Sequence, residues 1–170
     1  MVLMGTASFL KNWQQPGKQQ QQQAQAALEQ LHIAHLRDVS FSEISGGEQQ
    51  LAIIARSIAQ QSRIIIMDEP CASLDFGNQI MVLEMIRWLA GSGYLVIQST
   101  HDPNHALQYS DHVLILQEGQ LSSQGPPEEV LTSQSLETLY QVPVGIHEFG
   151  DQGQKVCVAQ KKEEHYVGHL

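Results

Sequence analysis

A short, wholly aliphatic run that ends in two acids limits this chain to few folds. Ile64–Met67 contains only apolar side chains and leads into Asp68 and Glu69. A second strand-like run, Tyr94–Gln98, follows the helical pattern of Gln79–Ala90. Wholly apolar runs of this length are typical of parallel strands that are buried on both faces. The order strand, helix, strand therefore predicts an α/β fold with a mainly parallel sheet flanked by helices.

Further helices and strands are expected on both sides of this pair. The glutamine run Gln19–Gln23 is the solvated start of a surface helix that continues over residues 24–31, and a second helix begins near Ser45. The apolar stripe of the second helix, at positions i, i+3, i+4 and i+7, consists of Leu51, Ile54, Ala55 and Ile58. The elements expected after the second strand are a helix over Asn104–Tyr109, a strand over His112–Leu116, a turn at Glu118-Gly119, a return strand over Gln120–Ser123 and a helix from Pro126.

Composition and charge exclude several classes of protein. The chain has 170 residues, of which 42% are hydrophobic and 16% charged, and this balance is typical of a globular domain rather than of a disordered segment. Nine basic residues against eighteen acidic ones give a net charge of −9. The longest basic cluster is the pair Lys161-Lys162. We therefore expect no nucleic-acid partner.

Cysteine content and hydropathy predict where the protein works. Cys71 and Cys157 are the only cysteines, too few for a disulfide framework, so a reducing compartment is expected. No run approaches the roughly 20 apolar residues that a membrane span needs. Met1–Leu10 is mildly apolar but lacks a basic leader and a cleavage site. We expect a cytoplasmic protein without direct membrane insertion, whose membrane role comes through a partner.

The stretch Ser45-Gly46-Gly47-Glu48 allows two interpretations. As local structure it is a capping box, in which the serine hydroxyl caps a backbone N–H and Glu48 reaches back. A capping box does not explain the glycines, because each costs about 1 kcal/mol in a helix relative to alanine. They are explained if a ligand approaches the backbone closely, and the positive end of a helix suits a phosphate. The sequence leaves both interpretations open.

The acids Asp68 and Glu69 are candidates for metal binding and catalysis. The carboxyl end of a parallel strand is where ligands bind in open α/β sheets. Asp68 could hold Mg²⁺ through water, and Glu69 could polarise an attacking water. The alternative is a solvated strand end without a function. A helix follows, with Asp75 or Asn78 as its expected cap.

His101 follows the second strand and is the remaining candidate. A single histidine at a strand end is more often structural than catalytic. His101 and His105 are four residues apart, which is also a spacing of metal ligands. No Cys, Glu or further His stands beside them in the sequence to complete a zinc site, so none is expected.

The ordered set of these motifs resembles the ATPases of ABC transporters. The set matches the signature motif, Walker B, the D-loop and the switch histidine, and consists of Ser45-Gly46-Gly47-Glu48, Ala55-Arg56, Ile64–Pro70, Ser73-Leu74-Asp75 and Thr100-His101-Asp102. The similarity extends over nearly the whole chain. Gln124–Leu131 adds a resemblance to the importers of iron–siderophore, haem and cobalamin. The resemblance implies a partial P-loop NTPase-like fold.

The family resemblance also implies a role for each motif. Asp68 positions Mg²⁺, Glu69 is the general base for hydrolysis of ATP, and His101 contacts the γ-phosphate. Ser45, Gly46 and Gly47 bind the γ-phosphate of an ATP held by a second subunit, and the neighbouring Glu48 is counted with them among the cofactor-binding residues. Asp75 crosses the interface of that ATPase dimer. Two such chains would then drive a transmembrane permease from the inner face of the cell membrane.

The chain departs from the family pattern in its phosphate-binding loop. Glu48 replaces the usual glutamine and Cys71 a common threonine, which are small changes. The loop G-x-x-x-x-G-K-[ST] is a larger loss, because its backbone and lysine hold the β- and γ-phosphates. Around the only Gly-Lys pair, Gly17-Lys18, the first glycine is replaced by Asn12 and the Ser or Thr by Gln19. Alone, this chain is expected neither to bind ATP tightly nor to hydrolyse it.

These inferences define a predicted organisation and two main functions. Residues 1–44 are expected to form part of a helical subdomain, residues 45–143 the signature helix with the C-terminal part of the ATPase core, and residues 144–170 a C-terminal appendage. The first function is that of an importer ATPase truncated before the signature motif. The alternative is an inactive remnant that supplies the signature motif in trans as a dimerisation module. A soluble ABC ATPase without a permease is a third reading.

Overall fold

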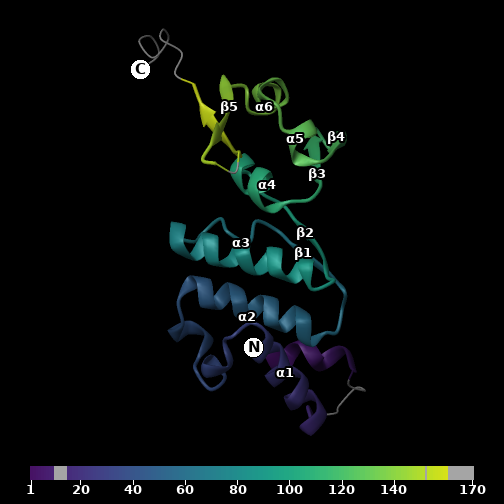
Figure 1. Cartoon of the computed structure of the whole chain (residues 1–170). Coiled ribbons are helices and arrows are strands. Elements are labelled where there is room, and N and C mark those ends of the chain that lie inside the picture. The colour runs from purple at the N-terminus through teal and green to yellow at the C-terminus, as the bar shows by residue number, and fades with distance from the viewer. Residues whose placement is uncertain (10–14, 152, 161–170) are drawn as a thin grey trace, which may run out of the picture. The chain divides into compact units, whose positions relative to one another are not determined.

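The computed structural model describes residues 1–9, 15–151 and 153–160, and its chain forms two compact units (Figure 1). The first unit comprises Met1–Thr100 and the second His101–Leu170. Each unit has its own helices and strands and is described by itself. Asn12 and residues 161–170 of the predicted appendage lie outside the described residues.

The first unit places three α-helices beside a parallel strand pair. Its elements, in chain order, are η1 (Val2–Phe9), α1 (Lys18–Gln30), η2 (Ala34–Leu36), η3 (Phe41–Glu43), α2 (Gly46–Ala59), β1 (Ile64–Met67), α3 (Phe76–Gly91) and β2 (Leu95–Gln98). Helix α2 is central and contacts η1, α1 and α3 (Figure 1). Its predicted apolar stripe is confirmed, since Leu51, Ile54, Ala55 and Ile58 are all buried.

Strands β1 and β2 are parallel and in register, with Ile64 opposite Leu95 and Ile66 opposite Ile97. Successive side chains of a strand point to opposite faces. Ile65 is 2% exposed, whereas Ile66 is 75% exposed. The wholly apolar pattern predicted burial on both faces, and one face of β1 is open instead. This uncovered apolar face, which we call the open face, is formed by Ile64, Ile66, Leu95 and Ile97.

The second unit consists of two antiparallel hairpins and three helices. Its elements are α4 (Pro103–Tyr109), β3 (Val113–Gln117), β4 (Gln120–Gly125), α5 (Pro127–Val130), α6 (Ser133–Tyr140), β5 (Val144–Phe149) and β6 (Gln154–Ala159). The predicted turn at Glu118-Gly119 is confirmed, and both residues have positive φ, 51° and 75°. A small core joins α4, β3, α5, α6 and β5 and consists of Ala106, Ile115, Val130, Leu131, Leu136 and Val144.

Two parts of this unit were not predicted. Helix α6 was not anticipated, and the β5–β6 hairpin occupies much of the region expected to be an appendage. The hairpin pairs Val144 with Ala159 and Phe149 with Gln154. It also contacts α4, through β6, and α6, through β5. The hairpin is therefore packed into the second unit up to residue 159.

Candidate functional site

The N-terminus of α2 is closed by the predicted capping box. The hydroxyl of Ser45 accepts a hydrogen bond from the backbone N–H of Glu48 at 3.3 Å. In return, Glu48 Oε2 accepts from the backbone N–H and from the hydroxyl of Ser45, each at 2.8 Å. These bonds favour the carboxylate, so first the N–H and then the hydroxyl of Ser45 lower the pKa of Glu48, with a smaller contribution from His35.

The two glycines of this helix end have different surroundings. Gly47 is buried, and a Cβ there would lie 2.7 Å from Cγ of Asn78 and 2.7 Å from the methyl carbon of Met81. Gly46 is exposed, and its nearest neighbour would be a methyl group of Leu74 at 3.2 Å. Packing of α2 against α3 therefore accounts for Gly47. It does not account for Gly46.

Asp75 is the N-cap of α3. Its Oδ1 accepts from the backbone N–H of Asn78 at 3.0 Å, and its Oδ2 accepts from the side-chain amide of the same residue at 2.7 Å. These two bonds lower the pKa of Asp75, in that order of importance. Asn78 thus contacts both Asp75 and the position of Gly47. The structure brings the predicted signature stretch next to the predicted D-loop residue.

Asp68 and Glu69 end β1 and are joined to the end of β2 by Ser99. The Ser99 hydroxyl donates to Asp68 Oδ1 at 2.5 Å and accepts from the backbone N–H of Glu69 at 2.9 Å. The backbone N–H of Ser99 donates to the carbonyl oxygen of Met67 at 3.0 Å, which continues the parallel ladder by one bond. Glu69 has a φ of 44°, an uncommon value for a non-glycine residue.

Ser99 was not identified from the sequence as a site residue. The available signal was its position, directly after the second predicted strand, because parallel strands bring their carboxyl ends to one edge. Asp68 is exposed, and one of its oxygens is bound by a hydroxyl. Such a carboxylate fits Mg²⁺, which keeps several waters and takes further oxygens from phosphates. Among the described residues, no group of three or more His, Cys, Asp or Glu side chains is arranged to hold a metal.

His101 begins the second unit and is exposed. Its carbonyl oxygen accepts a hydrogen bond from the Tyr140 hydroxyl at 3.0 Å. Asp102 caps α4, with Oδ1 accepting from the backbone N–H of Asn104 at 2.8 Å. Asp102 Oδ2 lies 3.5 Å from Nε2 of His105. The main chain at His101 is therefore held by a tyrosine of α6 that the sequence did not connect to it.

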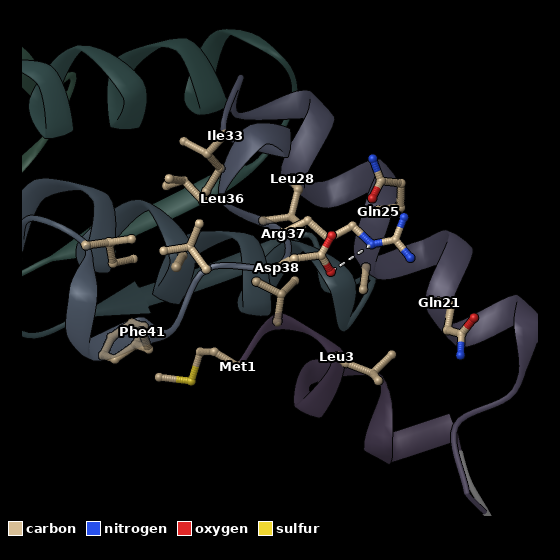
Figure 2. Close-up of a pocket in the computed structure, with 15 residues that line it drawn as sticks. Met1, Leu3, Gln21, Gln25, Leu28, Ile33, Leu36, Arg37, Asp38 and Phe41 are labelled. Carbon is tan, nitrogen blue, oxygen red and sulfur yellow. Dashed lines mark ion pairs between the residues drawn. The ribbon is translucent and has the colours of Figure 1, made fainter.

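A cavity of about 310 Å³ lies elsewhere in the first unit, between η1, α1 and residues 33–44 (Figure 2). Its lining is largely apolar, and Leu28, Leu36 and Phe41 contribute to it. The side chains of Arg37 and Asp38, 3.8 Å apart, also line it (Figure 2). None of the predicted site residues lines this cavity. Gly17-Lys18 starts α1, where the Gly17 N–H donates to Gln20 Oε1 at 3.0 Å.

Comparison with known proteins identifies the class. Residues 2–72 match the family model described as ABC transporter. An uncharacterized ABC transporter ATP-binding protein of Haemophilus influenzae is 44% identical over 87% of this chain and 57% of its own length. The hemin import ATP-binding protein HmuV of Roseobacter denitrificans is 42% identical over 68% of this chain and 47% of its own length. The chain thus spans about half the length of these relatives.

Structural similarity agrees with the sequence matches. A solved chain described as belonging to a metal-chelate type ABC transporter aligns with a TM-score of 0.88 and 31% identity, covering 94% of this chain and 65% of that one. The ADP conformation of MJ1267, an ATP-binding cassette of an ABC transporter, aligns with a TM-score of 0.71 and 25% identity, over 82% of this chain and 62% of that one. The fold is that of an ABC ATPase cassette. The resemblance to ABC transporter ATP-binding subunits is confirmed.

Proposed function

We propose that this chain provides the signature, Walker B, D-loop and switch-histidine part of the ATP-binding subunit of an ABC importer. The observation that carries the proposal is the link through Ser99, which holds Asp68 and Glu69 together at the carboxyl end of β1. This is the edge at which ligands bind in parallel α/β sheets. The names of the relatives, hemin import and ferric enterobactin transport, support an iron or haem importer.

Each residue has a role in this proposal. Asp68 would hold Mg²⁺, and a bound ion would supply charge neutralisation at the phosphates. Glu69 accepts a proton from the water that attacks the γ-phosphate, as a general base does. His101 donates a hydrogen bond to that phosphate. Asp75 stands at the interface with a second ATPase subunit.

Ser45 and Gly46 act toward the ATP of the second subunit. The first N–H groups of a helix have no partner within the helix and lie at the positive end of its dipole. Gly46 is exposed, so a phosphate can approach its backbone without meeting a side chain. Gly47 and Glu48 belong to the same turn, and Glu48 holds it closed by its bonds to Ser45. The capping box and phosphate binding are then compatible.

The proposed partners and location follow from this function. The subunit works as a dimer and on transmembrane permease subunits, at the cytoplasmic face of the membrane. In the described part of the chain, every helix is too short or too polar to cross a membrane. Coupling to transport therefore goes through the permease in this proposal.

The test is ATP hydrolysis by a fused cassette. In it, residues 1–170 follow the N-terminal part of the Haemophilus influenzae relative, which is 44% identical to this chain. Mg²⁺-dependent hydrolysis by the fusion supports the proposal, and the 170-residue chain alone is expected to show none. A fusion that folds and binds MgATP but does not hydrolyse it would contradict the catalytic roles.

The second candidate is a non-catalytic module that offers the signature helix to a complete ATPase. The observation that favours it is that the signature turn is closed by this chain's own residues, through the hydrogen bonds between Ser45 and Glu48. In that case the chain should stimulate a complete partner ATPase, and Gly46→Asp should abolish the stimulation by placing a negative charge at the phosphate site. Absence of any association with the partner eliminates this candidate.

A further inference from the structure

Helix α6 carries a tyrosine to the carbonyl of His101. Leu136 is fully buried in the core of the second unit, together with Ala106 of α4. Tyr140 stands four residues after Leu136, so the two side chains lie on the same face of α6. The core therefore fixes the direction in which Tyr140 points. Its hydroxyl donates to the carbonyl oxygen of His101 at 3.0 Å.

Asn104 ties the same segment to the C-terminal hairpin. Its Oδ1 accepts from the backbone N–H of Cys157 at 2.7 Å, and its Nδ2 donates to the carbonyl oxygen of Cys157 at 3.3 Å. The side-chain amide thus bonds both backbone groups of one β6 residue, as a neighbouring strand would. These two residues are 53 positions apart in the sequence. These two hydrogen bonds fix the start of α4 relative to β6.

The phenol of Tyr140 remains a donor over the physiological pH range. Burial raises its pKa, and the charge of Asp102 raises it further. Burial, and then Asp102, also raise the pKa of the Cys157 thiol. The tyrosine therefore stays protonated when a hydrogen bond to a carbonyl requires it.

We infer that Tyr140 and Asn104 are positioning residues for His101, and that the C-terminal β5–β6 hairpin is part of the device that presents this histidine to the nucleotide. The inference rests on the proposed function, in which His101 contacts the γ-phosphate. One hydrogen bond holds the backbone at His101 itself, and two more hold it three residues later. Because both ends of this short segment are fixed, few backbone conformations are available to His101, and its exposed imidazole points in a restricted range of directions.

The Tyr140 and Asn104 contacts differ from ordinary packing because they are hydrogen bonds to the backbone. Neither the Tyr140 hydroxyl nor the Asn104 amide fills the core. The Tyr140 hydroxyl bonds the backbone carbonyl of His101, and the Asn104 amide bonds the backbone of Cys157 in β6. Removing either polar group should therefore change the position of His101 with only a small loss of stability of the fold.

The test uses the full 170-residue chain and two NMR readouts that need no nucleotide. The first is the set of imidazole signals of His101. The second is hydrogen exchange of the backbone N–H of Asn104, which donates to Asp102. Tyr140→Phe should shift the His101 signals and speed exchange at Asn104 about three- to tenfold, the size expected for one net hydrogen bond. Asn104→Ala should shift the same signals and speed exchange at Cys157.

The matched control is Tyr109→Phe, which removes the same hydroxyl from α4 and should leave both readouts unchanged. The inference is overturned if Tyr140→Phe leaves the His101 signals in place. It is equally overturned if Tyr109→Phe shifts them as much. The proposed function is tested separately, by His101→Ala in the fused cassette. Unchanged hydrolysis there would remove the catalytic role of His101, while shifted NMR signals would still show that Tyr140 positions it.

Discussion

At the residue scale, the first turn of α2 depends on the charge of one carboxylate. Glu48 receives two hydrogen bonds from Ser45, and both require an oxygen that accepts without carrying a proton. The pKa of Glu48 in the folded chain is below its ordinary value of 4.5. Its contribution to stability is therefore complete above pH 4.5 and is lost as the pH falls through the folded-state pKa.

The substitution Glu48→Gln tests this dependence. Both bonds end on Oε2, so the amide oxygen of glutamine can still accept them, but without the negative charge they should be weaker. The variant should therefore unfold at a lower temperature than the wild type at pH 7. The difference should shrink below pH 4.5, because the wild type then loses the same interaction. Thermal unfolding followed by circular dichroism between pH 3 and 7 measures it. A difference that is the same at every pH would show that charge plays no part.

Gly47 gives a second prediction at this scale. A methyl group there would displace Asn78, which is held by two hydrogen bonds to Asp75. Gly47→Ala should therefore destabilise the chain by about 1–3 kcal/mol, as overpacking does, despite the better helix propensity of alanine.

Gly46→Ala is the matched control, because its Cβ would meet only a methyl group of Leu74 at 3.2 Å. It should change the free energy of unfolding by less than about 1 kcal/mol. Urea unfolding of both variants decides the question. Equal effects of the two substitutions would mean that packing against α3 is not the reason for a glycine at position 47.

The capping box could be predicted from the sequence because its partners are three residues apart and the pattern is local. The contact between Gly47 and Asn78 could not. It depends on how α2 and α3 pack, which periodicity does not define. From the sequence, both glycines indicated a close ligand, whereas the structure explains Gly47 by its internal neighbour Asn78.

At the scale of elements, the junction of β1 and β2 should be sensitive to Ser99. Ser99→Ala removes the donor to Asp68 and the acceptor for the Glu69 amide. A hydrogen bond to a charged group contributes about 1.5–3 kcal/mol. The free energy of unfolding should therefore fall by no more than about 3 kcal/mol. In the fused cassette, we expect ATP hydrolysis to slow while MgATP affinity is retained.

Ser92→Ala provides the comparison. Ser92 donates to the carbonyl oxygen of Trp88 at 2.9 Å, at the end of α3 and on no candidate catalytic residue. Its loss should leave the hydrolysis rate unchanged. If Ser92→Ala slows hydrolysis as much as Ser99→Ala, the Ser99 bridge has no specific role.

The elements themselves were predictable where their patterns are long or strongly apolar. Helices α2 and α3 and strand β1 follow from stripes and runs that periodicity identifies. Helix α6 has only eight residues, and β5 combines Gly145 with polar residues, so neither has a strong pattern. Instead, β5 is stabilised by its pairing with β6, and α6 by burial of Leu136.

At the scale of the whole molecule, the open face is the most unusual surface of the first unit. Ile64, Ile66, Leu95 and Ile97 are 54%, 75%, 56% and 46% exposed. Parallel sheets are normally covered on both faces. The relatives are roughly twice as long as the part that this chain matches, and additional sequence of that kind can cover such a face.

The chain alone should consequently self-associate through this face. Ile66→Thr should reduce light scattering and binding of an apolar dye without lowering the free energy of unfolding, because the side chain is 75% exposed. Ile65→Val, at a neighbouring position that is 2% exposed, should cost about 0.5–1.5 kcal/mol and leave association unchanged. Association that responds to Ile65→Val but not to Ile66→Thr would place the contact elsewhere.

The most direct test of the proposed function is the rate of ATP hydrolysis by the fused cassette with Glu69→Gln. A general base contributes about 10²–10⁴-fold to a rate, so the variant should lose that factor and still bind MgATP. Glu84→Gln, a change of the same kind at an exposed position of α3, should keep the full rate. If Glu69→Gln hydrolyses ATP as fast as the unchanged fusion, the carboxylate at the end of β1 is not the base, and the central claim is wrong.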